Sequence, residues 1–140
     1  MEDLLRRIIE EALSLGASYA EVRYEENYSC NLMISNGEVK RAGTSARQGI
    51  GIRVLADGAF CFVSTSGLKE DDLLKLTREA VKSAKAISKL KKEKISLADA
   101  KPVADKVIYK PLKNPVEVDL SEKKELSLRI DNAIRSVDER

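Results

Sequence analysis

The residues best suited to chemistry in this sequence are two cysteines, Cys30 and Cys61, and a Gly-x-Gly pattern at Gly49 and Gly51 that precedes Arg53. The chain contains no histidine. This excludes a Ser-His-Asp triad, a Cys-His dyad and every histidine-ligated metal site within the chain. Two cysteines alone cannot complete the usual tetrahedral zinc site unless carboxylates or a second chain contribute. The residues therefore predict neither an active site nor a metal site.

Both cysteines lie in segments whose pattern predicts β-strands. Cysteine is among the residue types most often buried, so we expect Cys30 and Cys61 to be buried free thiols. The N-terminus is charged and lacks the apolar segment of a signal peptide. No apolar run approaches the ~20 residues that span a bilayer. We therefore expect a cytoplasmic protein without a membrane partner, where thiols stay reduced and a disulfide does not form.

The Gly-x-Gly pattern could suggest a phosphate-binding loop. A dinucleotide fingerprint, however, needs a third glycine that opens a helix directly after a strand. Here the glycines lie inside a predicted strand over residues 48–56. A glycine within a strand marks close approach by another backbone or a bulge. Gly49, Gly51 and Arg53 share one face of this strand, and we predict that this bare face docks a peptide or protein partner.

The stretch from residue 19 to 66 alternates apolar residues with polar ones or glycine, which is typical of strands with one buried face. Two turn signals, Asn36-Gly37 and Asp57-Gly58, predict tight hairpins because a type I′ turn needs positive φ at both central residues. The predicted strands cover roughly residues 19–27, 29–35, 38–43, 48–56 and 59–64.

Two amphipathic patterns, at residues 2–15 and 69–92, predict helices that cover this sheet. Gly16 suits the C-terminal cap of the first, and Ser66 can cap the second. A third helix is predicted from residue 119, with Ser121 as its cap. The expected fold is α+β, with a mostly antiparallel five-stranded sheet covered by two helices. The expected element order is α-β-β-β-β-β-α, followed by a linker and the third helix.

The chain of 140 residues is expected to comprise an α+β domain at 1–92, a linker at 93–118 and a helix at 119–140. Residues 85–113 hold nine lysines and three acidic residues, and all three prolines lie between 102 and 115. A lysine-rich stretch can contact nucleic acid. With no arginine and one aromatic residue it offers little for base readout or stacking, so we expect a solvated linker. Because the last helix has no obvious element to pack on, we expect the protein to continue past Arg140 into a further domain.

Several segments together resemble the N-terminal region of the TldD/PmbA family, which is similar to zinc metallopeptidases and was first named as a modulator of DNA gyrase. The likeness depends on their order and spacing over nearly the whole chain. The segments are Gly16–Arg23, Ser35–Val39, Gln48–Val54 with Asp57-Gly58, and Pro115–Lys123 with Asp131.

The resemblance implies an α+β N-terminal domain joined to a larger, mainly β C-terminal domain. In the family, that second domain holds zinc through a His-Glu-x-x-x-His helix motif and a distant cysteine. The motif is absent here, and neither Cys30 nor Cys61 matches the ligand cysteine. The resemblance therefore implies no catalytic residue, metal ligand or cofactor in this chain, and zinc in the missing C-terminal domain. Family members act as dimers, often of two related subunits, and trim peptides such as antibiotic precursors or unfolded proteins.

We accordingly expect the non-catalytic N-terminal domain of a TldD/PmbA-like zinc-dependent peptidase that acts in peptide maturation or protein degradation. It would be inactive alone and would contribute to dimerisation and to the substrate path. The expected partners are its own C-terminal domain, a related subunit in a homo- or heterodimer, and a peptide substrate. A stand-alone peptide- or protein-binding module stays open as the alternative, and the sequence leaves open whether the parent is an active or a zinc-less subunit.

Overall fold

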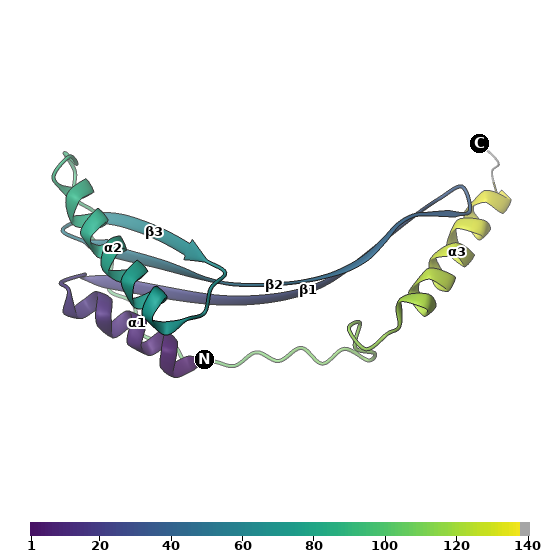
Figure 1. The fold of residues 1–140 in the computed structure, drawn as a ribbon, viewed down its shortest axis with the longest axis horizontal. Coiled ribbons are helices and arrows are strands. Elements are labelled where there is room, and N and C mark those ends of the chain that lie inside the picture. Colours follow the sequence, from purple (N-terminus) through teal and green to yellow (C-terminus); the bar gives the residue numbers. More distant parts are fainter. Residues whose placement is uncertain (138–140) are drawn as a thin grey trace. The chain divides into compact units, whose positions relative to one another are not determined.

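The computed structural model describes residues 1–137 of the chain. Its elements are α1 (Glu2–Ser14), β1 (Tyr19–Ser35), β2 (Glu38–Ala56), β3 (Ala59–Thr65), α2 (Glu70–Ser88) and α3 (Leu120–Val137), shown in Figure 1. The chain divides into two compact units. Unit 1 comprises residues 1–27 and 47–101, and unit 2 comprises residues 28–46 and the chain from Pro102 onward.

The sheet has three strands in the order β1-β2-β3, so the prediction of five strands is wrong, although the α+β class agrees with the structure. Polar residues at 27–29 and 44–47 suggested breaks, but β1 and β2 continue through them. Most side chains in both stretches are exposed. Ladder hydrogen bonds come from the backbone, and alternation of apolar and polar residues is needed only where one face is buried. Both faces of the ribbon are exposed in these stretches. The alternation of apolar and polar residues is therefore absent there, although the strands continue.

Both predicted hairpin turns are confirmed. Asn36 and Gly37 have φ values of 55° and 75°, and Asp57 and Gly58 have φ values of 51° and 79°. Positive φ at both central residues gives a two-residue turn whose twist matches that of the flanking strands. The second turn fixes the register between β2 and β3, which pair antiparallel from Ala56↔Ala59 to Ile50↔Thr65.

The β1–β2 hairpin in unit 2 contains a β-bulge. Its two-residue turn places Ser35 opposite Glu38, yet the hydroxyls of Ser29 and Ser45 lie 2.8 Å apart and so share a face. Ser29 lies six positions before Ser35, whereas Ser45 lies seven positions after Glu38. Because opposite residues share a face and successive residues alternate, β2 must contain one extra residue between Glu38 and Ser45.

The core of unit 1 lies between the sheet and the two helices α1 and α2, which also pack against each other. Apolar residues at alternate positions of β2 meet the apolar stripes of both helices. The buried core residues are Ile8, Ala12, Ala17, Ile50, Ile52, Val54, Ala56, Leu73, Ala80, Val81 and Ala84.

Helix α1 ends in the cap that the sequence predicts. Gly16 has a φ of 87°, its N–H donates to the carbonyl of Leu13, and the N–H of Ala17 donates to the carbonyl of Ala12. This is a Schellman motif, which requires a left-handed residue and therefore favours glycine. The cap turns the chain directly into β1.

The caps predicted for the other two helices are wrong. Helix α2 begins at Glu70 after Lys69, which makes no side-chain cap, and three acidic residues in its first turn offset the helix dipole instead. At α3 the carboxylate of Asp119 accepts hydrogen bonds from the N–H and the hydroxyl of Ser121. Asp119 therefore caps α3, because its carboxylate satisfies an N–H of the first turn that lacks a helical partner.

Unit 2 is held together by contacts between α3 and the tip of the β1–β2 hairpin. The N–H of Gly37 donates to Asp131 Oδ2 at 2.7 Å, and Arg135 Nε donates to the same oxygen at 3.0 Å. No residue of α3 is fully buried. Large apolar side chains along α3 are more than half exposed, namely Leu126, Ile130, Ile134 and Val137. Residues 89–119, between α2 and α3, form neither helix nor strand.

Candidate functional site

The three residues predicted to form a docking face, Gly49, Gly51 and Arg53, lie on the side of the β2 strand that faces away from α1 and α2. Residues Ile50, Ile52 and Val54, between and beside them, enter the core. Alternation along the strands and the β2–β3 register assign the neighbours on this side. We call the set the outer face, and it consists of Tyr19, Glu21, Arg23, Gly49, Gly51, Arg53, Leu55, Phe60, Phe62 and Ser64.

Arg53 is paired within the outer face. Its guanidinium donates a hydrogen bond to the carboxylate of Glu21 and lies over the ring of Phe60, 5.6 Å from the ring centroid. The hydroxyl of Tyr19 donates to the same carboxylate at 3.1 Å. The hydrogen bond from Arg53 is the main reason that the pKa of Glu21 lies below its ordinary value, and the pKa of Arg53 is raised in turn. Arg53 therefore presents a neutralised, orienting contact and is not a free cation.

The glycines of the outer face allow close approach by β3. A Cβ at Gly51 would come within 3.1 Å of the ring of Phe62, and one at Gly49 within 3.2 Å of the carbonyl oxygen of Thr65. The aromatic ring therefore occupies the space that a side chain at Gly51 would fill. Phe62 is itself 65% exposed, so the face presents an aromatic surface where the sequence suggested a bare one.

Sequence reasoning missed Phe60 and Phe62 as part of this face. The signal was available, because the two-residue turn at Asp57-Gly58 fixes which residues of β3 lie opposite Arg53 and Leu55. The notion of a docking face at Gly49, Gly51 and Arg53 stays a prediction.

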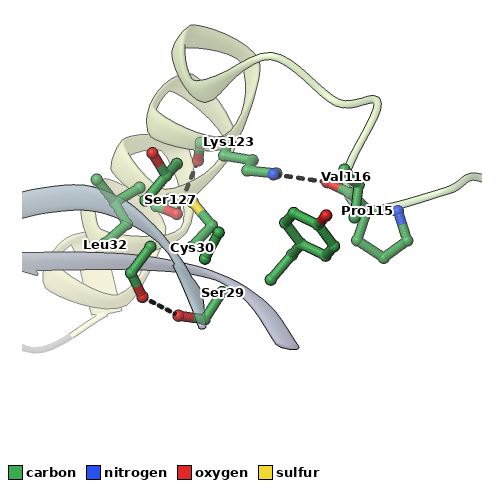
Figure 2. A pocket seen from close by; sticks show the side chains of 11 residues that line it. Ser29, Cys30, Leu32, Pro115, Val116, Lys123 and Ser127 are labelled. Carbon is green, nitrogen blue, oxygen red and sulfur yellow. Dashed lines mark hydrogen bonds between the residues drawn. The ribbon is translucent and has the colours of Figure 1, made fainter. Parts of the chain in front are cut away.

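A second candidate site is an open cavity of about 560 Å³ within unit 2. Figure 2 shows it between the β1–β2 hairpin and the start of α3 with the turn before it. Its polar groups bond to one another: Lys123 Nζ donates to the carbonyl of Pro115 at 2.7 Å, and Ser127 Oγ donates to the carbonyl of Lys123 at 2.8 Å. The lining residues are Tyr28, Ser29, Cys30, Leu32, Thr44, Ser45, Ala46, Pro115, Val116, Lys123 and Ser127.

The thiol of Cys30 borders this cavity and is exposed, so the prediction of two buried thiols is wrong for Cys30, while Cys61 is half-buried. The average tendency of cysteine to be buried does not hold at a site where a two-stranded ribbon has little covering it. Both cysteines are free.

Residues 20–84 match the family profile for "PmbA/TldA metallopeptidase domain 1". The chain belongs to the TldD/PmbA family. The matched segment contains nearly all of β1, the whole of β2 and β3, and most of α2. It therefore includes nearly all of the outer face.

Known relatives agree with this membership. A protein named as a metalloprotease from Methanocaldococcus jannaschii is 30% identical over 118 residues, which are 84% of this chain and 26% of the relative. Two solved structures share the fold. TldE from Thermococcus kodakarensis has a TM-score of 0.66 at 16% identity, over 97% of this chain and 30% of TldE. A candidate modulator of DNA gyrase from Bacteroides thetaiotaomicron has a TM-score of 0.63 at 17% identity, over 89% of this chain and 28% of that protein.

Within residues 1–137 no three His, Cys, Asp or Glu side chains gather where they could hold a metal. Cys30 belongs to unit 2 and Cys61 to unit 1. In the same part of the chain, no helix has the length and apolar character to cross a bilayer.

Proposed function

We propose that this chain is the non-catalytic N-terminal domain of a TldD/PmbA-like zinc-dependent peptidase that acts in peptide maturation or protein degradation. The observation that carries the proposal is a match to the first domain of a metallopeptidase family in a sequence without histidine. The chain spans about a quarter of the metalloprotease relative. A larger C-terminal domain would then supply the zinc ligands and the general base.

Within such a peptidase the chain would contribute surfaces to the dimer and to the substrate path. The outer face supports this role because it exposes Phe62, and aromatic residues are enriched at protein interfaces. Unit 2 adds an open cavity lined by apolar and polar side chains. Both surfaces would act by binding, because the resemblance places the catalytic groups of the family in the C-terminal domain.

The test compares this chain alone with the native protein that contains it. An antibody raised against the chain identifies and isolates the native protein from source cells. We expect a native mass well above 15.5 kDa, bound zinc by metal analysis, and hydrolysis of labelled unfolded casein. The chain alone should hold no stoichiometric zinc and leave the casein intact. Zinc bound stoichiometrically by the chain alone, or cleavage by it, would refute the proposal.

The second candidate is a stand-alone peptide- or protein-binding module. The exposed Phe62 beside the half-exposed Arg53 favours it, because the aromatic ring and the guanidinium paired with Glu21 together form an aromatic and polar contact surface. A native mass of 15.5 kDa would support this reading. Selection from a displayed peptide library should then yield peptides whose binding is lost with Phe62→Ser and retained with Met33→Ser, a control in unit 2 with a similar exposure.

A further inference from the structure

Strand β3 presents a free backbone edge. It is the last strand of the sheet, and no strand pairs with its outer side within residues 1–137 (Figure 1). The pair that closes the two-residue turn, Ala56↔Ala59, is hydrogen-bonded. Along an antiparallel ladder, hydrogen-bonded pairs then alternate with pairs whose backbone groups do not bond to each other. The intervening residues of β3 therefore direct both backbone groups away from β2. These residues are Phe60, Phe62 and Ser64.

This edge lacks the devices that normally prevent strands from pairing with other chains. Natural edge strands carry charges, prolines or bulges for that purpose. The seven residues of β3 include no charged residue and no proline, and their register with β2 is uninterrupted. The opposite edge strand, β1, carries Glu21, Arg23 and Glu25 in unit 1. The sheet of unit 1 is thus protected at one edge and open to pairing at the other.

We propose that β3 pairs antiparallel with β3 of a second copy of this chain, about a two-fold axis at Phe62. This inference rests on the dimerisation in the proposed function and assigns it an interface. The outward-facing residues are symmetric about Phe62, so Phe62 lies opposite its equivalent and Phe60 lies opposite Ser64 of the second copy. About six backbone hydrogen bonds would form, two in each hydrogen-bonded pair. The two sheets become one continuous sheet of six strands.

The chemistry of the edge favours a second copy as the occupant. Because β3 is uncharged, two copies meet without burying an unpaired charge. The nearest outer-face cation, Arg53, is already neutralised by Glu21. The exposed ring of Phe62 would lie beside its own equivalent, and aromatic cross-strand pairs stabilise sheets. Such an interface is self-complementary and closes after two subunits, as most soluble oligomers do.

A cysteine at the two-fold axis tests the pairing and its register. In a background of Cys30→Ser and Cys61→Ala, Phe62→Cys should form a covalent dimer on mild oxidation. A hydrogen-bonded antiparallel pair has Cα atoms about 5.5 Å apart, within the disulfide range of about 4.4–6.8 Å. Ser64→Cys is the matched control, because its equivalent lies about 13 Å further along the strand at ~3.3 Å per residue. We expect at least tenfold more covalent dimer from Phe62→Cys.

A second variant tests the backbone groups themselves. Ser64→Pro removes an N–H that faces away from β2, so the β2–β3 ladder keeps its hydrogen bonds. Sedimentation should show at least tenfold weaker dimerisation with an unchanged circular dichroism spectrum.

The outcomes separate this inference from the proposed function. If the chain dimerises but Phe62→Cys and Ser64→Cys form equal amounts of disulfide, the β3 interface is refuted while dimerisation itself is not. A chain that stays monomeric at 100 µM would overturn both the interface and dimerisation by this chain, while the zinc and casein measurements still judge the peptidase assignment. Pairing of Phe62→Cys with a different subunit or with a peptide, but not with itself, would overturn the second copy as occupant.

Discussion

Truncation of Ile52 to alanine should remove a large share of the stability of unit 1. Ile52 lies in the central strand and is fully buried between the sheet and the helices. The change deletes three carbons, worth about 2.4 kcal/mol at ~0.8 kcal/mol per buried methylene. Incomplete collapse of the resulting cavity adds to this, so we expect a loss of about 3–4 kcal/mol. The total free energy of unfolding of a unit of roughly 80 residues is about 4–12 kcal/mol. The expected loss is therefore a large share of it.

Urea unfolding followed by far-UV circular dichroism measures this loss, because the chain has no tryptophan to report by fluorescence. Ile87→Ala is the matched control within unit 1, since Ile87 is 42% exposed on α2. Alanine is also the better helix former, so the control should lose less than about 1 kcal/mol. Equal losses from the two variants, or a loss below about 1 kcal/mol for Ile52→Ala, would refute the assignment of the core.

Three further substitutions test local features of the fold. The lowered pKa of Glu21 means that its ionised form stabilises unit 1 above the ordinary carboxyl pKa and that this contribution disappears as the pH falls through the lowered value. Glu21→Gln should therefore flatten the loss of thermal stability as the pH falls below the ordinary carboxyl pKa, and an unchanged pH slope would count against the pair. Gly58→Ala should cost at least about 1–2 kcal/mol in urea, because φ is 79° and the new Cβ would approach a lysine Cβ to 2.6 Å; a neutral change would contradict the turn. Asp131→Asn should weaken the contact with the Gly37 N–H by about 1–3 kcal/mol, seen as faster amide exchange in α3, whereas unchanged protection would argue against that contact.

Local features of this protein followed directly from its sequence. Asn36-Gly37 and Asp57-Gly58 gave two hairpins because few residue pairs tolerate positive φ at successive positions. Gly16 ended α1 for the same steric reason. The apolar stripes of α1 and α2 predicted which helix faces enter the core, because burial must follow the 3.6-residue period.

The candidate site was predictable only in part. Alternation along β2 placed Gly49, Gly51 and Arg53 on one face. It could not show that Glu21 neutralises Arg53 or that Phe62 covers Gly51, since both depend on neighbouring strands. The cap of α3 was also predicted wrongly, because more than one polar residue near the start of a helix can serve as its N-cap. Here Asp119 is the N-cap and Ser121 lies in the first turn.

The sequence alone determined the helices, the turns and the absence of histidine, because each depends on residue identity or on a few consecutive positions. Tertiary structure decided the number of strands, the exposure of Cys30 and the free edge of β3. Strand continuity through residues 27–29 and 44–47 depends on backbone hydrogen bonds between the two arms of the β1–β2 hairpin, and hydropathy does not record these bonds. Burial likewise depends on what covers a strand, and that is a property of the assembled fold.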